Sequence, residues 1–345
     1  MTAVPSLPGQ FIRALGQWVP ASAARQFSRP SALLFHGVET EIDDPRVQVV
    51  HHRCDAFRAI ASSLKKNFDI LPLAELGRVL KAPGRNARAL FLMSDDGYLN
   101  NLTGAAAILG ELNIPWTLFI STKHIDTQES DPLFLARLFF YFAPSGSYRI
   151  DGLDEVIDLG SKGQRRDVAR ATTWRLKMLP ADVAKPAVDS MIRVLSRTKL
   201  CSLLQRFSSE TFMTWPQVRE LHERGVEIGA HAHWHWPMRK GPAEYFLEQA
   251  SLPKQRIEAE VGPCRFFAYP FGTMDDVSRE AWHAVRDAGY DYAFTTLAGS
   301  LDASSNRWLM PRYTIGLSEQ NVAGMVPLLR TGNLRLSLWQ RSLAA

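Results

Sequence analysis

Three features that would classify a protein at once are scarce or missing in this sequence. Its three cysteines, Cys54, Cys201 and Cys264, lie far apart and form no CxxC pair, so they support neither a disulfide framework nor a thiolate zinc site. Nowhere do about 18 apolar residues follow one another, so no transmembrane helix is predicted. No dense run of lysine and arginine with interleaved aromatic residues occurs either, which argues against nucleic-acid binding.

The N-terminus also lacks a signal peptide, since no basic start precedes a continuous apolar segment. We therefore expect a cytoplasmic protein. The formal net charge of +5 and the pI of about 9.1 are mildly basic, which would suit an anionic substrate or a membrane surface. A hydrophobic content of 46% and a length of 345 residues are sufficient for one large α/β barrel or two domains.

Both ends of the chain contain amphipathic segments. Residues 1–28 place Phe11, Leu15 and Trp18 at helical spacing, and residues 321–345 mix leucines with arginines. Such segments lie on a membrane surface in some proteins and more often dock on their own domain. We expect docking, and peripheral contact with the inner membrane is the alternative. The oligomeric state is not indicated.

Between these ends, predicted strands and helices alternate. Short apolar runs bounded by turn residues predict buried strands, and amphipathic stretches such as 55–68 predict helices. This alternation with short connections is typical of parallel βαβ units. It fails from about residue 125 to 213, where the sequence looks helical. We therefore predict an α/β barrel over residues 29–320 that contains a helical insertion.

Two adjacent carboxylates, Asp95 and Asp96, directly follow the apolar run at 89–93 and precede Gly97. Like charges held close together resist joint ionisation, so such a pair usually needs a cation or a proton. The carboxyl ends of parallel strands are also where α/β proteins build their active sites. Taken alone, the motif is equally compatible with an Asp-Gly turn whose carboxylates are solvated.

Alternating histidines, His231, His233 and His235, follow a second predicted strand. His231 and His235 are four residues apart and would present their rings on the same side if a helical turn begins there. Two histidines and one carboxylate leave a coordination position open, as in hydrolytic zinc centres. The run alone could also be structural, and we expect His233 at the surface.

A third strand ends in the turn-forming sequence AYPFG, residues 268–272, which turn formation alone would explain. Together the three motifs resemble the polysaccharide deacetylases of the NodB-homology class, carbohydrate esterase family 4. MSDDG (93–97) is similar to the TFDDG motif of that family, HAHWH (231–235) to H-[ST]-x-x-H, and AYPF to R-x-P-[YF]. The resemblance covers roughly residues 30–315 and implies a distorted (β/α)7 TIM-like barrel.

The resemblance also implies roles for individual residues. Asp96, His231 and His235 would hold one divalent metal ion, with Zn²⁺ preferred and Co²⁺ or Ni²⁺ compatible. The metal would lower the pKa of a bound water, and Asp95 would take the proton of that water as general base. The backbone N–H of Phe271 would stabilise the oxyanion.

The sequence departs from the family pattern at several positions. Ala232 replaces the Ser/Thr of the second motif, and Ala268 replaces the arginine that orients the base, for which Arg312 is our candidate substitute. No Leu-x-His follows the third motif, but Leu34–His36 ends the first predicted strand. This resembles a circularly permuted branch that includes biofilm poly-N-acetylglucosamine deacetylases. We therefore predict His36 as the general acid.

Three aromatic residues near the motifs are predicted to contact the sugar: Tyr269, Trp234 and Trp236. For the two tryptophans, core packing is an equal alternative. The resulting hypothesis is a hydrolase that removes N-acetyl groups from amino sugars of a bacterial polysaccharide or a lipid-linked glycan.

Three alternatives to this hypothesis remain. A deformylase of a lipid-linked amino sugar would use the same site. A non-catalytic carbohydrate-binding protein on the same barrel would explain the lost arginine, although it would have no reason to keep both aspartates and both histidines. Amidohydrolases and metallo-β-lactamases also use His-x-His, but the β-lactamase type expects Asp-His where Trp236 and Pro237 stand.

Overall fold

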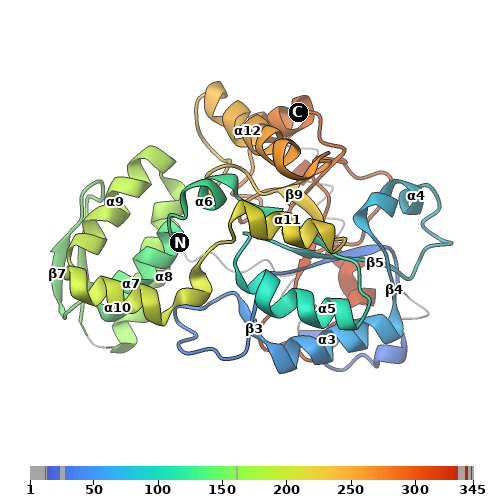
Figure 1. Cartoon of the computed structure of the whole chain (residues 1–345), viewed down its shortest axis with the longest axis horizontal. Coiled ribbons are helices and arrows are strands. Elements are labelled where there is room, and N and C mark those ends of the chain that lie inside the picture. The colour runs from blue at the N-terminus through green and yellow to red at the C-terminus, as the bar shows by residue number, and fades with distance from the viewer. Residues whose placement is uncertain are drawn as a thin grey trace.

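The computed structural model describes residues 12, 14–23, 28–160, 162–332, 339–340 and 343. It shows an α/β barrel with a helical lobe beside it, on the left in Figure 1. Parallel strands form the main sheet in the order β11-β10-β9-β6-β5-β1-β12, and the short β4 pairs with the start of β5. These strands are β1 (Ser31–Phe35), β4 (Asp69–Ile70), β5 (Ala89–Ser94), β6 (Thr117–Ile120), β9 (Glu227–Ala230), β10 (Phe266–Ala268), β11 (Tyr292–Phe294) and β12 (Tyr313–Thr314).

The sheet is curled, and its first and last strands lie next to each other. β1 pairs with β5 on one side, where Phe35 is opposite Ser94, and with β12 on the other. From β11, the backbone of Ala293 exchanges hydrogen bonds with the segment 307–310, which leads into β12. The predicted (β/α)7 barrel is therefore confirmed.

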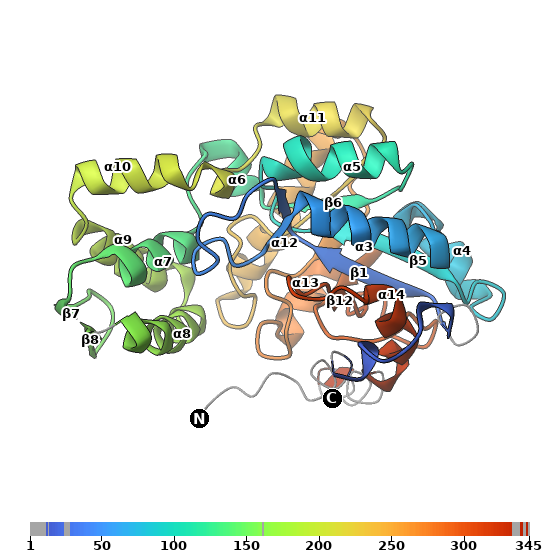
Figure 2. The same cartoon turned by 90° about the horizontal axis from the view of Figure 1, so that it is seen from below.

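Helices cover the outside of the sheet, and α3, α5 and α11 form a row in both Figure 1 and Figure 2. The predicted helix at 55–68 corresponds to α3, whose buried stripe includes Phe57, Ile60 and Leu64. The ring of Phe57 lies 4.5 Å from that of Phe35 in β1. The barrel helices are α3 (Cys54–Asn67), α4 (Leu76–Lys81), α5 (Ala106–Glu111), α6 (Thr122–Thr127), α11 (Trp215–Glu223), α12 (Ala243–Val261), α13 (Arg279–Asp287) and α14 (Val322–Met325).

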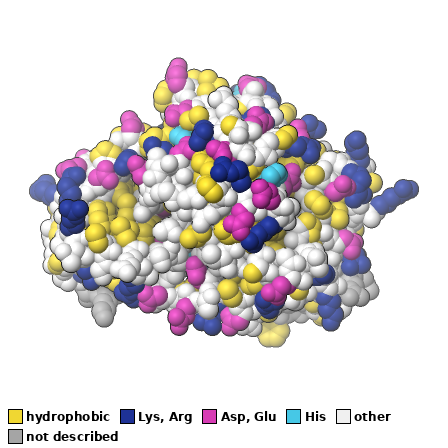
Figure 3. Space-filling view, in the orientation of Figure 1, with side chains coloured by type: hydrophobic (Ala, Val, Ile, Leu, Met, Phe, Trp, Pro, Cys, Tyr) yellow, Lys and Arg dark blue, Asp and Glu magenta, His cyan; other side chains and the backbone are white. Residues whose placement is uncertain are grey.

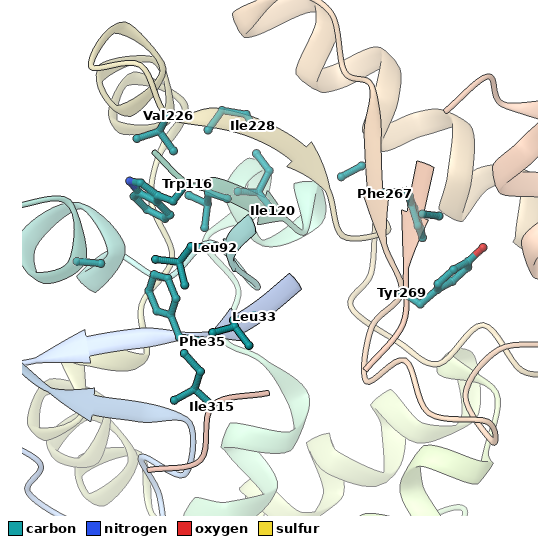
Figure 4. Packing of buried hydrophobic residues seen from close by; sticks show 14 of the residues in the cluster. Leu33, Phe35, Leu92, Trp116, Ile120, Val226, Ile228, Phe267, Tyr269 and Ile315 are labelled. Carbon is teal, nitrogen blue, oxygen red and sulfur yellow. The ribbon is translucent and has the colours of Figure 1, made fainter. Parts of the chain in front are cut away.

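Side chains alternate between the two faces of the strands. Outward residues such as Leu33, Leu92 and Phe267 pack under the helices, as Figure 4 shows. Inward residues such as Phe91 and Phe294 fill the barrel with a second apolar cluster. Burial of each large side chain contributes about 1.5–3 kcal/mol, so both clusters stabilise the strand ends that follow them.

The lobe corresponds to the predicted helical insertion. Its helices are α7 (Pro132–Phe142), α8 (Lys162–Met178), α9 (Ala181–Arg193) and α10 (Arg197–Arg206). They share a separate hydrophobic core that includes Phe139 and Leu176. The lobe also contains an antiparallel hairpin, β7 (Gly146–Arg149) and β8 (Val156–Leu159), which the helical prediction missed. In β8 buried and exposed residues alternate, but the exposed Val156 is apolar, so the residue types do not show this strand period.

Short elements complete the chain: η1 (Ala21–Ala23), β2 (Gly37–Glu39), β3 (His51–Arg53), η2 (Leu73–Glu75), a π-helical turn η3 (Asn101–Ala105), η4 (Ser208–Glu210) and η5 (Val326–Gly332). The N-terminal segment docks on the barrel, because Asn321 donates hydrogen bonds to the carbonyl oxygens of Gly16 and Val19 at 2.9 Å each. Phe11 and the leucines of 334–338 lie outside the described residues. Within the described ranges, no helix combines the length and apolar character needed to cross a bilayer.

Candidate active site

Asp95 and Asp96 leave the end of β5 in different directions. Asp96 has a φ of +79° and Gly97 a φ of +90°, so the chain turns sharply through the left-handed region, which aspartate tolerates better than most residues. Both aspartates are buried, with 2% of the surface of Asp95 and 3% of the surface of Asp96 exposed. The solvated Asp-Gly turn is therefore wrong, and each carboxylate has its own partners.

The partner of Asp95 is Arg312, which lies just before β12. Its Nη1 and Nη2 donate to Oδ1 and Oδ2 of Asp95 at 2.7 and 2.8 Å, and its Nε donates to the carbonyl of Thr295 at 3.1 Å. Burial alone raises the pKa of Asp95, but the charges of Arg312 and His231 outweigh it and hold this pKa below its usual value. Asp95 is therefore ionised at neutral pH.

Asp96 faces the two predicted histidine ligands. Its Oδ1 lies 3.3 Å from Nε2 of His231 and 3.0 Å from Nε2 of His235. Among the described residues, this buried oxygen has no hydrogen-bond partner of acceptable geometry. Three donor atoms of the kinds that zinc prefers thus converge within 4.8 Å of one another. The residues present fit a divalent cation.

The electrostatics of His235 support this conclusion. Burial lowers the pKa of its imidazole, but Asp96 and Asp131 outweigh burial and raise that pKa to about 10. A positive charge at this position is therefore favoured, and either a proton or a metal ion can supply it.

His231 and His235 are brought together by a loop and not by a helical turn. Ala232 and His235 adopt left-handed backbone angles, with φ of +58° and +50°. Gln249 of α12 accepts hydrogen bonds from the N–H groups of His233 and Trp234, which fixes the loop. His233 is 8% exposed and its Nδ1 lies 2.8 Å from Oγ1 of Thr122, so its expected surface position is wrong. The loop folds back onto α6 and α12, and this buries it.

His36 follows β1 at the same end of the barrel. Because Phe35 is opposite Ser94 in the sheet, His36 comes to lie beside Asp95. Burial lowers the pKa of His36, and the charges of Asp96 and Asp95 offset that effect only in part. The imidazole is therefore neutral at neutral pH and has an available acceptor nitrogen.

Phe271 lies in the turn after β10. Its φ is +59° and that of Gly272 is +62°, where an added Cβ would lie 2.9 Å from the nitrogen of Thr296. Within the described part of the chain, the N–H of Phe271 has no hydrogen-bond acceptor. The ring of Phe271 lies 5.0 Å from that of His235, and Nζ of Lys177 lies 3.8 Å from its centroid.

One cavity of about 260 Å³ joins these groups. The predicted residues that line it are His36, Asp95, Asp96, His231, His235 and Phe271. Asp131, Arg137 and Lys177 of the lobe form the rest of its charged wall, and none of them was identified from the sequence. Asp131 precedes Pro132 and caps α7, so the sequence does signal a helix start there, but it does not indicate the partner of that carboxylate.

The sequence model of the family described as polysaccharide deacetylase matches residues 83–293, which is more than half of the chain. The chain belongs to the polysaccharide deacetylase family. The deacetylase is accordingly a hydrolase that acts on N-acetylated glycans. The matched span includes Asp95 and Phe271 but neither His36 nor Arg312.

Solved structures with a similar fold also carry deacetylase names. The Streptococcus pyogenes deacetylase PplD, in complex with acetate, has a TM-score of 0.54 at 13% identity and covers 89% of this chain and 97% of its own. The putative polysaccharide deacetylase BA0330 from Bacillus anthracis has a TM-score of 0.55 at 14% identity, covering 87% and 69%. A de-N-acetylase from Aggregatibacter actinomycetemcomitans has a TM-score of 0.52 at 16% identity, covering 85% and 97%. At these identities only the fold is shared. No curated protein matches the sequence.

None of the three predicted sugar contacts lines the cavity that contains the aspartates. Tyr269 is fully buried under the helices, and its hydroxyl donates to the carbonyl of Trp308 at 2.9 Å. Because side chains alternate along β10, Ala268 faces the barrel interior and Tyr269 faces away from it. Trp236 is 4% exposed in the core of the lobe, where its indole N–H donates to the carbonyl of Leu179. The prediction for Tyr269 is wrong, whereas core packing, the alternative for Trp236, is what the structure shows, and Trp236 also borders a cavity of about 240 Å³ outside the site of the aspartates.

Trp234 is the third predicted contact, and it is only half-buried. It lines a cavity of about 450 Å³ between the lobe and α12 and another of about 240 Å³ between the lobe and α6, both outside the site of the aspartates. Nζ of Lys123 lies 5.0 Å from its ring centroid. Figure 3 shows apolar side chains gathered on the lobe, the part of the deacetylase that forms one side of these cavities.

Proposed function

We propose that the deacetylase removes acetyl groups from N-acetylated amino sugars with one divalent metal ion held by Asp96, His231 and His235. The observation that carries the proposal is the convergence of two Nε2 atoms on a buried carboxylate oxygen that has no hydrogen-bond partner among the described residues. Zn²⁺ suits this donor set best, and Co²⁺ or Ni²⁺ would also fit. A bound ion supplies Lewis-acid polarisation of the amide carbonyl and a water of lowered pKa.

Asp95 would act as the general base. It is ionised, and the guanidinium of Arg312 holds its carboxylate plane through two hydrogen bonds. A carboxylate offers about four lone-pair positions, so each Asp95 oxygen can still accept a proton donor from the cavity. A base held in one orientation loses little entropy when the substrate arrives.

His36 would supply a proton to the departing amine. An amine anion is a very poor leaving group, so the nitrogen must be protonated as the bond breaks. His36 lines the same cavity as Asp95 and is neutral before the reaction. The proton that Asp95 takes from the attacking water would therefore pass to His36 and from His36 to the amine, which leaves both residues as they began. The N–H of Phe271 would hydrogen-bond to the carbonyl oxygen as negative charge develops there.

The N-acetylated substrate that we propose is a bacterial polysaccharide or a lipid-linked glycan. The de-N-acetylase name of one structurally similar protein supports acetyl as the acyl group that is removed from the sugar nitrogen. A deformylase would use the same residues on a smaller acyl group, so it remains the second candidate. Branch membership by circular permutation stays a prediction based on His36.

An acyl-release assay tests the proposal. Metal-loaded and chelator-treated protein would be compared on N-acetylated oligosaccharides and on lipid-linked N-acetyl and N-formyl amino sugars. We expect acetate release only from metal-loaded protein. Equal activity after chelation would overturn the metal assignment. Formate without acetate would identify a deformylase, and glycan binding without either product would overturn the catalytic assignment.

Membrane contact and the cytoplasmic location also remain proposals. Trp18 is 85% exposed and Leu15 is 40% exposed on the docked N-terminal segment, which supports an interfacial role for this segment. Co-sedimentation with anionic liposomes would test it, with Trp18→Ala as the variant. No binding by the full chain would overturn membrane contact.

A further inference from the structure

Asp131 contacts a predicted metal ligand although it belongs to none of the three motifs. Its Oδ2 lies 3.0 Å from Nδ1 of His235, and both side chains are buried. Asp131 lies in the lobe, at the N-cap of α7, whereas His235 lies in the barrel loop after β9. This contact therefore joins the two parts of the molecule at the active site.

The start of α7 fixes the orientation of Asp131. Its Oδ1 accepts a hydrogen bond from the N–H of Phe134 at 2.8 Å, and Pro132 occupies the first turn. Aspartate is among the best N-cap residues, and the helix dipole favours a negative charge there. With one oxygen used as the cap, the other is directed at His235.

This contact selects one tautomer of His235. A neutral imidazole has one N–H, so a hydrogen bond from Nδ1 to Asp131 leaves the lone pair on Nε2. Nε2 is the atom that faces Asp96 at 3.0 Å. His231 has the same arrangement, because its Nδ1 lies 2.8 Å from the carbonyl of Ala268. Only His235 is oriented by a charged group, and only that group comes from the lobe.

We propose that Asp131 is a positioning residue that holds His235 in its metal-binding tautomer, so that the helical lobe completes the metal site. The inference rests on the metal site of the proposed function and extends it to a residue outside the family motifs. Carboxylates behind ligating histidines raise the basicity of the ligand, and their loss typically weakens metal binding by about 10–100-fold.

The carboxylate of Asp131 could alternatively bind a second metal ion together with His124. The buried Nε2 of His124 has no hydrogen-bond partner in the described part of the chain, and His124 lies with Asp131 and His235 in a second group of donor atoms within 4.8 Å of one another. A second ion there would require His235 to lose its remaining proton and bridge two cations. Nδ1 of His235 is already directed at Asp131, so we expect one ion per chain.

Zinc affinity measured by competition with a chromophoric chelator tests the inference. Asp131→Asn keeps a cap acceptor for Phe134 but directs an N–H at His235, and Asp131→Ser keeps the cap and removes the carboxylate. We expect both variants to bind zinc about 10–100-fold more weakly than the unchanged protein. Thermal unfolding of the metal-free proteins would show that both variants are folded.

A matched control is Ser196→Ala, which removes the N-cap of α10 in the same lobe, where Ser196 accepts from the N–H of Lys199. We expect its zinc affinity to be unchanged. Unchanged affinity in both Asp131 variants, an equal loss in Ser196→Ala, or two ions per chain would each overturn the inference. Failure of the unchanged protein to bind zinc would overturn the proposed metal site itself, which is a distinguishable result.

Discussion

Arg312 donates two hydrogen bonds to Asp95 from a position 217 residues away in the sequence. The family pattern places the base-orienting arginine where this chain has Ala268. Here the guanidinium comes instead from the residue just before β12, the last strand of the barrel, which lies beside β1. The contact shows that an arginine from a different strand can reach the carboxylate of the predicted base.

Replacement of Arg312 should reduce turnover more than metal content. Arg312→Lys keeps the charge but loses the planar fork that makes two parallel hydrogen bonds. General-base catalysis contributes about 10²–10⁴-fold, so we expect the rate of acetate release to fall by an amount up to that range. Zinc content should be unchanged. Arg307→Lys, an exposed arginine in the same segment, is the control, and wild-type turnover in Arg312→Lys would contradict the orienting role.

Asp95→Asn and Asp96→Asn form a pair of adjacent substitutions with different expected outcomes. Asp95→Asn removes the proton acceptor but no metal ligand, so it should retain zinc and lose turnover by about 10²–10⁴-fold. Asp96→Asn removes a charged ligand, so it should lose zinc, as His231→Ala should. Metal analysis of the purified variants together with an acetate-release assay measures both effects. Loss of zinc from both aspartate variants alike would show that the division of roles is wrong.

His36→Gln should affect amide and ester substrates differently. An amine leaving group needs a proton, whereas a nitrophenolate leaves without one. We expect a large loss of turnover on an N-acetylated sugar and a small loss on a nitrophenyl acetate, measured as kcat for each. An equal loss on both substrates would indicate that His36 positions other groups, and no loss on either would exclude it as the acid.

Glu210 should make stability depend on pH. Burial, together with the charges of Asp131 and Asp96, raises the pKa of Glu210 to about 8 despite the nearby Arg137. Because the pKa of Glu210 is higher in the folded protein than the unfolded value of 4.5, its contribution to the free energy of unfolding is complete below pH 4.5. This contribution is lost as the pH rises towards 8. The difference in unfolding free energy between the metal-free protein and Glu210→Gln should therefore fall by about 1.4 kcal/mol per pH unit over this window.

Urea unfolding at a series of pH values measures this difference. Glu223→Gln, at an exposed position, should show no comparable slope. The imidazole of His51, whose Nε2 lies 3.3 Å from Glu210, is held neutral because burial lowers its pKa to about 3. The pair is thus a protonated carboxyl facing a neutral imidazole. A pH-independent difference for Glu210→Gln would show that this carboxyl is ionised in the folded protein.

Trp234→Ala should weaken the binding of oligomers but not of single sugars. Its half-buried ring lines the two cavities next to the lobe, outside the site of the aspartates, and an extended glycan that reached from the catalytic cavity into them would stack on it. Loss of about 0.7–1.4 kcal/mol of stacking would raise KM for an oligosaccharide by about three- to tenfold. Trp174→Ala, at a 49% exposed position on α8, is the control. Unchanged KM for all chain lengths would exclude Trp234 as a sugar contact.

The barrel and the strand-end residues could be predicted because they depend on local patterns. A buried strand followed by polar residues indicates the active edge of a parallel sheet, and this pattern placed Asp95 and His231 at one edge. His36 was added from the family resemblance, and all three line one cavity. The prediction that Tyr269 contacts the sugar was wrong, although the alternation of side chains along β10 could be read from the sequence. Tyr269 points to the opposite face from Ala268, the position that stands in for the family arginine.

Contacts between the lobe and the barrel could not be predicted in the same way. Asp131 is recognisable as a helix cap, but no periodicity in the sequence indicates where the lobe places that cap. Its contact with His235 depends on the angle at which α7 meets the barrel, which is set by packing in the separate core of the lobe. Such long-range positions are fixed by tertiary packing and not by local propensity.

Because β1 pairs with both β5 and β12, the contact between Asp95 and Arg312 joins an early and a late part of the chain, which matters during synthesis. The strand that carries Asp95 leaves the ribosome long before the segment that carries Arg312, so the nascent chain holds an incomplete site for most of its synthesis. A chain interrupted before residue 312 could contain every ligand of the predicted metal site and still lack the contact that orients its base. Catalytic competence therefore arrives late in translation, when the final strand closes the barrel.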